Sequence, residues 1–333
     1  TVFKLYDTYG FPVDMTADFA REKGFEVDLV KYEELMVQQK DRARSSSSFS
    51  SVLPESISIS GSTEFIGYEH TNSNTKIVEL ISSSKETKSK TLVEDEEGIV
   101  ILDQTPFYAE AGGQIGDKGT IRGSDFKFEV LDTQKIGDHH GHFGVVKEGK
   151  LKINSKVEAH IDEDFRGRIV PNHSATHLLQ AALKKVLGDH IEQKGSLVED
   201  NRLRFDFAHS EQVSPEELVE IEDLVNLHIA KNTKSVTKVM SVEEATKKGA
   251  IAFFGEKYGE EVRVLSMGKE NGNYFSTELC GGTHVKNTKD IGKFKIINQS
   301  SIAAGVRRVE AVSYTHLRAH ETRHDLVCRL LLE

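Results

Sequence analysis

The sequence has few cysteines, no long apolar run and no excess of positive charge. Its two cysteines, Cys280 and Cys328, cannot build the disulfide framework of a small secreted domain, so we expect a reducing, cytoplasmic setting. No apolar run approaches the roughly 18 residues of a membrane span, and no charged start followed by an apolar stretch resembles a secretory signal. The formal net charge of −10 argues against a protein that coats nucleic acid through bulk charge, although it leaves room for a local basic groove.

The composition is typical of a globular protein with more than one domain. Of the 333 residues, 37% are hydrophobic and 29% are charged. At roughly 150 residues per domain, a chain of this length is expected to form two or three domains. Changes of pattern along the chain predict an α+β fold in four regions, which are residues 1–50, 51–164, 165–313 and 314–333.

The first region is predicted to be helical and the second to be a small antiparallel β-barrel. Helical spacing runs through "DLVKYEELMVQQKDRAR", and the serine-rich "RSSSSFSS" marks the boundary. After this boundary, strand-like runs alternate with turn residues, in "TKIVELI", "EGIVILD", "FKFEVLD", "HFGVV" and "KVEAHID". The glycine-rich "TPFYAEAGGQIGDKG" lacks the lysine and Ser/Thr ending of a phosphate-binding P-loop, so it predicts structural turns rather than a phosphate cradle.

The third region mixes helices and strands, as a compact α+β unit does. One amphipathic helix is predicted from Asn172, its expected N-cap, to Gly188, its expected stop. A second helix is predicted after Ser214 in "SPEELVEIEDLVNLHIAKN", where Glu217 completes a capping box. The runs "RLRFDF" and "EVRVLSM" alternate as strands do.

Two pairs of potential metal ligands occur in this region. His173 and His177 are four residues apart on the predicted helix, so their rings share one face and can bind one ion. Cys280 and His284 are also four residues apart, and the glycines between them let the backbone fold tightly around an ion. Each pair alone has an ordinary interpretation, as surface or core histidines or as a buried cysteine in a turn. Together they predict a site for one zinc ion per chain.

The two ends of the chain have unusual features. The sequence begins at Thr1 without a methionine, so we expect it to be the middle of a larger protein. At the other end, "SYTHLRAHETRHDLVCRLLLE" carries His316, His320, His324 and Cys328 at intervals of four. The string resembles translated library-adaptor sequence, and we expect the residues from Tyr314 to have no biological role. The alternative is a short terminal helix with a coincidental histidine stripe.

Seven motifs occur in an order that is typical of one family. They are "FKLYDTYGFPVD", "TPFYAEAGGQIGDKG", "NHSATHLL", "QKGSLV", "FGEKYG", "STELCGGTH" and "AAGVRRVEA". Over residues 1 to 313 this order resembles that of the alanyl-tRNA synthetases. The resemblance implies the end of the helical tRNA-recognition region, then the β-barrel, then the zinc-dependent editing domain that free-standing alanyl-tRNA editing proteins also have.

The resemblance also implies what the chain does. The family's activation core, with its ATP and magnesium, would lie before Thr1, and the C-terminal region for oligomerisation and tRNA binding would follow residue 313. We therefore expect no ligase activity, but zinc-dependent hydrolysis of Ser-tRNA and Gly-tRNA charged on the alanine tRNA. The implied partner is the acceptor end of that tRNA, in the cytoplasm, with no membrane and no DNA.

The resemblance assigns further residues to the site. Thr176, between the two histidines, matches a position that helps to reject correct alanine, although it also fits an ordinary helix threonine. Gln193 matches a position that lines the site, where its amide would bind a serine hydroxyl or the terminal ribose; otherwise it is a strand or turn glutamine. Four basic residues are candidates for phosphate contacts or for solvated surface, namely Lys293, Lys295, Arg307 and Arg308.

The chemistry and two competing functions remain open at this point. Zinc can polarise the ester carbonyl, activate a water or position the acceptor end, but four protein ligands form a closed site of the kind that is usually structural. A zinc-stabilised tRNA-binding module without catalysis is therefore the alternative. A metalloprotease fits less well, because "HSATH" has no glutamate beside its first histidine.

Overall fold

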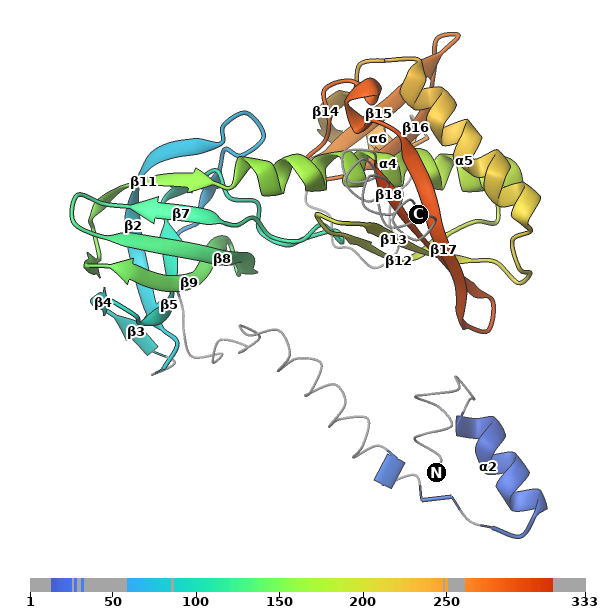
Figure 1. Ribbon diagram of the computed structural model, residues 1–333, viewed down its shortest axis with the longest axis horizontal. Coiled ribbons are helices and arrows are strands. Elements are labelled where there is room, and N and C mark those ends of the chain that lie inside the picture. Colours follow the sequence, from blue (N-terminus) through green and yellow to red (C-terminus); the bar gives the residue numbers. More distant parts are fainter. Residues whose placement is uncertain are drawn as a thin grey trace, which may run out of the picture. The chain divides into compact units, whose positions relative to one another are not determined.

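The computed structural model describes residues 13–25, 27–28, 31–32, 59–84, 87–247, 249–250 and 261–313 (Figure 1). The chain divides into two compact units, Thr1–Ile57 and Ser58–Glu333. In the first unit, helix α2 spans Val13–Glu22. Most of the second helix predicted there, the "FGEKYG" motif and the tail from Tyr314 lie outside the described residues.

The second unit starts with a closed antiparallel barrel, as predicted. Six strands follow one another in the order β11-β7-β8-β9-β5-β2, and pairing of β11 with β2 closes the ring. The apolar residues of these strands alternate, so that in β11 Val157 and Ala159 are buried while Lys156 and Glu158 are exposed. The strands are β2 (Asn72–Ser82), β5 (Glu97–Leu102), β7 (Gly119–Arg122), β8 (Lys127–Ile136), β9 (His139–Glu148) and β11 (Lys156–Ile161).

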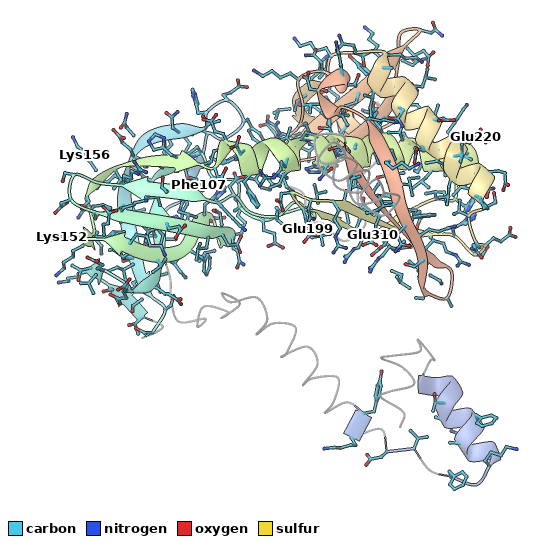
Figure 2. All side chains as sticks on the ribbon, in the orientation of Figure 1. Phe107, Lys152, Lys156, Glu199, Glu220 and Glu310 are labelled. Atoms are coloured by element: carbon cyan, nitrogen blue, oxygen red, sulfur yellow. The ribbon has the colours of Figure 1, made fainter. Side chains whose placement is uncertain are left out.

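The barrel region has a buried interior, a polar outer surface and several short strands at its edges. Phe107 is fully buried inside it, whereas Lys152 and Lys156 lie at its outer surface (Figure 2). The expected turns of the glycine-rich loop are present, because Gly112 and Gly113 have φ of 58° and 83°, where other residues are strained. The short strands are β1 (Glu64–Phe65) with β6 (Gln104–Thr105), β3 (Thr87–Ser89) on β2, and β4 (Thr91–Val93) with β10 (Lys150–Lys152).

A 25-residue helix, α4 (Glu163–Leu187), follows β11 directly (Figure 1). The predicted N-cap Asn172 is wrong, because Asp162 caps this helix and accepts a hydrogen bond from the Phe165 backbone N–H at 2.9 Å. Asn172 lies in the third turn, immediately after Pro171. Proline disfavours a helix interior, but burial of Phe165 and Ile169 against Val198 stabilises the turns before it. The predicted stop at Gly188 is confirmed.

Two further sheets and helix α5 (Pro215–Ala230) pack around α4. The Ser214–Glu217 capping box of α5 is confirmed. Buried side chains of α4 and α5, such as Leu178 and Val225, form one core with Phe205 and Phe207 of the four-stranded sheet. No helix among the described residues is long and apolar enough to cross a membrane. The sheets have the orders β12-β13-β18-β17 and β14-β15-β16. The remaining elements are β12 (Gln193–Val198), β13 (Leu203–Ala208), β14 (Val236–Ser241), α6 (Val242–Lys247), β15 (Glu261–Glu270), β16 (Asn273–Leu279), η1 (Thr288–Ile291), β17 (Phe294–Ala303) and β18 (Val306–Ser313).

Buried polar contacts fix the first turns of α4 against the barrel. The Arg166 guanidinium forms an ion pair with the Asp117 carboxylate, and it also donates to the backbone oxygens of Gly67 at 2.9 Å and Pro106 at 3.1 Å. Burial raises the pKa of Asp117, although the Arg166 side chain opposes this shift. A buried pair of this kind is costly to break, because removing one partner leaves the other charge buried alone.

Candidate metal centre

The structure brings the four predicted metal ligands together. His173 and His177 come from α4, and Cys280 and His284 come from the loop that follows β16. One potential ligand atom from each of the four lies within 4.8 Å of the others. The two histidines of α4 are buried, while Cys280 and His284 are partly buried.

Each histidine of α4 is oriented by a second buried side chain. The Nδ1–H of His173 donates to Gln114 Oε1 at 2.6 Å, so that its Nε2 faces Cys280 Sγ at 3.5 Å. The Nδ1–H of His177 donates to Glu278 Oε2 at 2.6 Å. Its Nε2 is buried with no hydrogen-bond partner among the described residues. Such contacts fix the tautomer of a metal-binding histidine and direct its free nitrogen towards the ion.

The loop between β16 and η1 requires glycine. Cys280 Sγ lies 3.1 Å from His284 Nε2 and accepts from the Gly282 backbone N–H at 3.4 Å. A Cβ atom on Gly282 would collide with the His173 ring and approach Gln114 Oε1 to 2.9 Å. The close approach of this backbone to α4 therefore depends on the absence of a side chain.

The charges in the cluster favour a thiolate. Burial raises the pKa of Cys280, but the neighbouring His173, His284 and His177 lower it well below its ordinary value. Burial lowers the pKa of His284 to about 3, so this imidazole is neutral at pH 7. For His177 the lowering by burial is outweighed by the Glu278 and Cys280 charges, which raise its pKa to about 10. The thiolate and the Glu278 carboxylate thus both stabilise the protonated form of His177.

This donor set fits zinc. Thiolate and neutral imidazole are common zinc ligands, and ligand atoms around a tetrahedral zinc are separated by roughly 3.3–3.8 Å. Two of the Cys280 distances, 3.1 and 3.5 Å, are already close to that range. The Nε2 of buried His177 has no partner among the described residues, so it offers a further lone pair once His177 loses a proton on metal binding. The cluster is therefore compatible with zinc, with Gln114 and Glu278 as its supporting side chains.

A pocket of about 320 Å³ opens beside the cluster, at the lower end of the size range of ligand sites. Its walls come from α4, β12, the glycine-rich loop of the barrel and the loop between β16 and η1 that contains Cys280, which we call the cysteine loop. Thr176 and Gln193, the two predicted residues beside the ligands, both line it. The Thr176 hydroxyl donates to the Asn172 backbone oxygen at 2.9 Å, so only its lone pairs are available to a ligand. The Gln193 amide has no partner among the described residues.

The predicted phosphate contacts are not among the residues that line this pocket. Arg308 forms two hydrogen bonds with the Asp206 carboxylate, at 2.7 and 2.8 Å, and Arg307 donates to the Ser210 backbone oxygen at 3.0 Å. Lys295 pairs with Glu222 at 3.1 Å. Lys293 lines a separate groove beside α5. Contacts of these residues with phosphate thus remain a prediction, and those of Arg308 would compete with a carboxylate.

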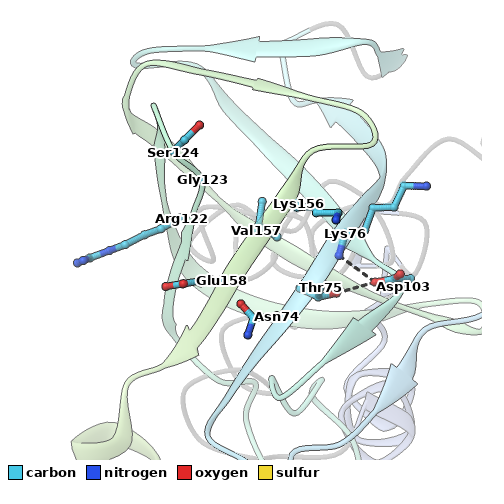
Figure 3. Close-up of a pocket in the computed structure, with 10 residues that line it drawn as sticks. All are labelled: Asn74, Thr75, Lys76, Asp103, Arg122, Gly123, Ser124, Lys156, Val157 and Glu158. Atoms are coloured by element: carbon cyan, nitrogen blue, oxygen red, sulfur yellow. Dashed lines mark hydrogen bonds between the residues drawn. The ribbon is translucent and has the colours of Figure 1, made fainter.

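A wider groove of about 850 Å³ lies on the barrel (Figure 3). It shares no lining residue with the pocket beside the cluster. One of its two carboxylates, that of Asp103, already accepts from the Thr75 hydroxyl at 2.6 Å and from the backbone N–H groups of Lys76 at 3.0 Å and Gln104 at 2.9 Å. These bonds stabilise the charged form and lower the Asp103 pKa, although burial opposes the shift. The groove therefore has the features of a barrel surface rather than of a reactive site.

Sequence reasoning missed two residues that support the cluster. Gln114 is part of the quoted glycine-rich motif, but nothing in its spacing connects it with a histidine 59 positions away. Glu278 precedes Cys280 by two positions in "STELCGGTH", yet its partner His177 is 101 positions away. The signal available in the sequence was that each of these residues, one amide and one carboxylate, lies inside a recognised motif.

Two known families match segments of the chain on either side of the first pair of histidines. The family described as tRNA synthetases class II (A) matches residues 1–165, which include the barrel and Gln114. The threonyl and alanyl tRNA synthetase second additional domain matches residues 262–310, which include Cys280 and His284. His173 and His177 lie between the two matched segments, on a helix whose first residues belong to the first segment.

Proposed function

Because the chain belongs to the class II (A) tRNA synthetases, with matches consistent with the alanyl enzyme, we propose that it hydrolyses Ser-tRNA and Gly-tRNA mischarged on the alanine tRNA. The observation that carries this proposal is the cluster of three histidines and one thiolate beside a small pocket. A hydrolytic metal site explains such a ligand set beside a cavity better than the alternative, in which the histidines are ordinary residues of a buried core.

A separate hydrolytic site answers a physical limit on selectivity. A pocket shaped for alanine cannot strongly exclude glycine, which is smaller, and serine adds only one hydroxyl. Discrimination based on such differences is roughly 10- to 200-fold. Hydrolysis of the wrong ester at a second site removes the remaining errors.

The residues of the site have distinct tasks in this proposal. His173, His177, Cys280 and His284 bind zinc, and Gln114 and Glu278 orient the two imidazoles of α4. When bound, zinc would polarise the ester carbonyl or lower the pKa of a water molecule. Thr176 lies in the pocket wall next to the ligands and presents lone pairs that an alanine methyl would leave unpaired.

The closed ligand set supports a second candidate function. Four protein ligands are typical of structural zinc sites, so the same cluster also fits a tRNA-binding module that does not catalyse hydrolysis. Both candidates predict zinc and tRNA binding. They differ in one product, free serine.

The two candidates are separated by incubating the chain with Ser-tRNA of the alanine isoacceptor and counting released serine, with and without a chelator. Hydrolysis that the chelator abolishes and zinc restores is expected. The His177→Ala variant should be inactive, and His190→Ala is its matched control, because the exposed His190 side chain contacts His209 outside the cluster. Zinc and tRNA binding without any serine release would establish the non-catalytic module and refute the hydrolase.

A further inference from the structure

The pocket beside the cluster contains two polar side chains, Gln180 and Ser196, that have no hydrogen-bond partner among the described residues. Gln180 on α4 is only 2% exposed, yet its amide has no hydrogen-bond partner among the described residues. The Ser196 hydroxyl on β12 is likewise buried and has no hydrogen-bond partner within the described residues. Buried polar groups are normally hydrogen-bonded, so unpaired groups that line a cavity indicate a ligand.

The contrast with a neighbouring amide supports this interpretation. Asn172, two turns earlier on α4, is also buried, but both ends of its amide are paired. Its Nδ2 donates to the Glu199 backbone oxygen at 2.9 Å, and its Oδ1 accepts from the Ser313 backbone N–H at 3.0 Å. The fold thus pairs one buried amide of this helix within the protein, whereas the amide of Gln180, which lines the pocket, has no partner among the described residues.

The position of Gln180 relates it to the metal ligands. It follows His177 by three residues and Thr176 by four, which places all three side chains on one face of α4. Ser196 enters the same pocket from β12, next to the glycine-rich loop, where the Val198 backbone N–H donates to the Gly113 oxygen at 2.7 Å. The two unpaired side chains therefore reach the pocket from two of its walls.

We propose that Gln180 and Ser196 form a subsite that binds the side-chain hydroxyl of a seryl ester. This inference rests on the proposed editing function and deepens it. An alcohol needs an acceptor for its proton and donors for its oxygen, and an amide together with a hydroxyl supplies both. Thr176 is less suited to this task, because its proton is already donated to Asn172.

The charges in the pocket argue for a hydroxyl rather than for the α-amino group. Neither Gln180 nor Ser196 is charged. The carboxylate among the lining residues, Glu278, already accepts from His177 at 2.6 Å and from the Ser276 hydroxyl at 2.9 Å. Glycyl esters lack the hydroxyl, so they would enter the pocket by size and gain nothing from this subsite.

Non-hydrolysable analogues test the subsite independently of catalysis. The probes are 3′-amino-3′-deoxyadenosine acylated through an amide with serine, glycine or alanine, titrated by calorimetry into the zinc-loaded full chain. Gln180→Leu and Ser196→Ala should each weaken binding of the seryl analogue about 10- to 100-fold, the effect of leaving a buried partner unpaired. Binding of the glycyl and alanyl analogues should change less than about twofold, since they make no bond to the subsite.

Controls keep the result interpretable. Gln299→Leu is a matched substitution outside the pocket, where the amide donates to the Val213 backbone oxygen at 2.9 Å, and it should leave all three affinities unchanged. Zinc content and melting temperature check the fold, and Ser196→Ala provides the test if Gln180→Leu is unstable. Equal weakening of the three analogues would show that the subsite binds the amino group or the ribose, and would overturn the inference. Unchanged seryl binding in both variants would also overturn it. Failure of the unsubstituted chain to bind any analogue or hydrolyse any ester would instead refute the proposed function.

Discussion

Replacement of Gln114 by leucine should weaken zinc binding about 10- to 100-fold, the usual effect of removing a side chain that orients a metal ligand. Gln114 Oε1 accepts from His173 Nδ1 at 2.6 Å and from the Thr283 backbone N–H at 3.0 Å. Gln114 itself is fully buried, so water cannot readily replace its amide. Leucine has a similar size but offers neither acceptor nor donor, so it leaves both N–H groups unpaired and also removes the Gln114 Nε2 contact with the Thr283 hydroxyl at 2.9 Å.

The expected magnitude follows from these contacts. Each buried group left unpaired costs about 1–3 kcal/mol, so the two N–H groups together cost roughly 2–6 kcal/mol. Part of this cost destabilises the fold, and the part that depends on His173 weakens metal binding. A loss of 10- to 100-fold in zinc affinity corresponds to about 1.4–2.8 kcal/mol, which lies within this range.

Competition with a chromophoric chelator measures the zinc Kd, and thermal unfolding measures stability. Gln114→Glu keeps an acceptor at the same position, so we expect it to restore most of the zinc affinity. The control is Gln134→Leu on the barrel, whose amide donates to Asp132 at 2.8 Å, and its zinc Kd should not change. An unaltered Kd in Gln114→Leu, or a Glu variant as weak as the Leu variant, would refute the orienting role of this residue.

Four other predictions concern the ligands, the selectivity, the pH dependence and the tRNA. Metal analysis should find about one zinc per chain, lost in Cys280→Ser and unchanged after deletion of residues 314–333; loss of metal on deletion would assign ligands to that segment. Thr176→Val should lower the ratio of Ser-tRNA to Ala-tRNA hydrolysis severalfold at constant zinc content, because the pocket wall loses the hydroxyl oxygen next to the cluster; a constant ratio would make Thr176 an ordinary helix residue. Burial lowers the pKa of His140 to about 4 and of His142 to about 3. At these two positions the unfolded chain therefore binds more protons than the folded chain below about pH 6.5, and each histidine should lower the free energy of unfolding by up to about 1.4 kcal/mol per pH unit as the pH falls to its folded pKa. A chemical denaturation midpoint that does not change between pH 6.5 and 4.5 would contradict this. Binding of tRNA should be weak and should fall steeply with salt, since the chain is acidic overall; tight binding that is indifferent to salt would show that phosphate contacts do not dominate.

The elements that the sequence predicted best have strong local patterns. The barrel strands around "TKIVELI" and "KVEAHID" appear as β2 and β11, because alternation of apolar and polar residues determines which face is buried. The capping box at Ser214 is equally local. The four-residue strand β7 was not among the strand-like runs named from the sequence, since "GTIR" is too short to show a period.

The start of α4 could not be derived from local pattern alone. Asn172 after Pro171 has the features of a helix start, and a proline usually ends or begins a helix. The actual start lies ten positions earlier, at the Asp162 cap, because Phe165 and Ile169 pack against Val198 from a distant strand. Tertiary packing of this kind overrides the local preference of the chain.

The four candidate metal ligands could be grouped from the sequence because each pair has a spacing that suits one ion, whereas their supporting residues have no such spacing. His173 and His177 share a helix face, and Cys280 and His284 share a tight loop, so each pair is local. Contacts such as Gln114 to His173 depend on how the barrel loop meets the helix. The contact between the loop and the helix depends on the tertiary structure, so it cannot be predicted from a local stretch of sequence.

The barrel therefore contributes directly to the candidate metal centre. Its glycine-rich loop supplies Gln114, and Tyr68, in another barrel loop, donates to the Gly281 backbone oxygen at 2.6 Å while Arg263 lies 3.5 Å above its ring. The ion pair between Arg166 and Asp117 fixes the start of α4, about two turns before His173. Because a helix is stiff over that distance, the barrel positions both the ligand pair on α4 and the cysteine loop that faces it. Substitutions at the barrel surface that contacts these loops should thus alter the geometry of the histidine and cysteine cluster without changing any of its four residues.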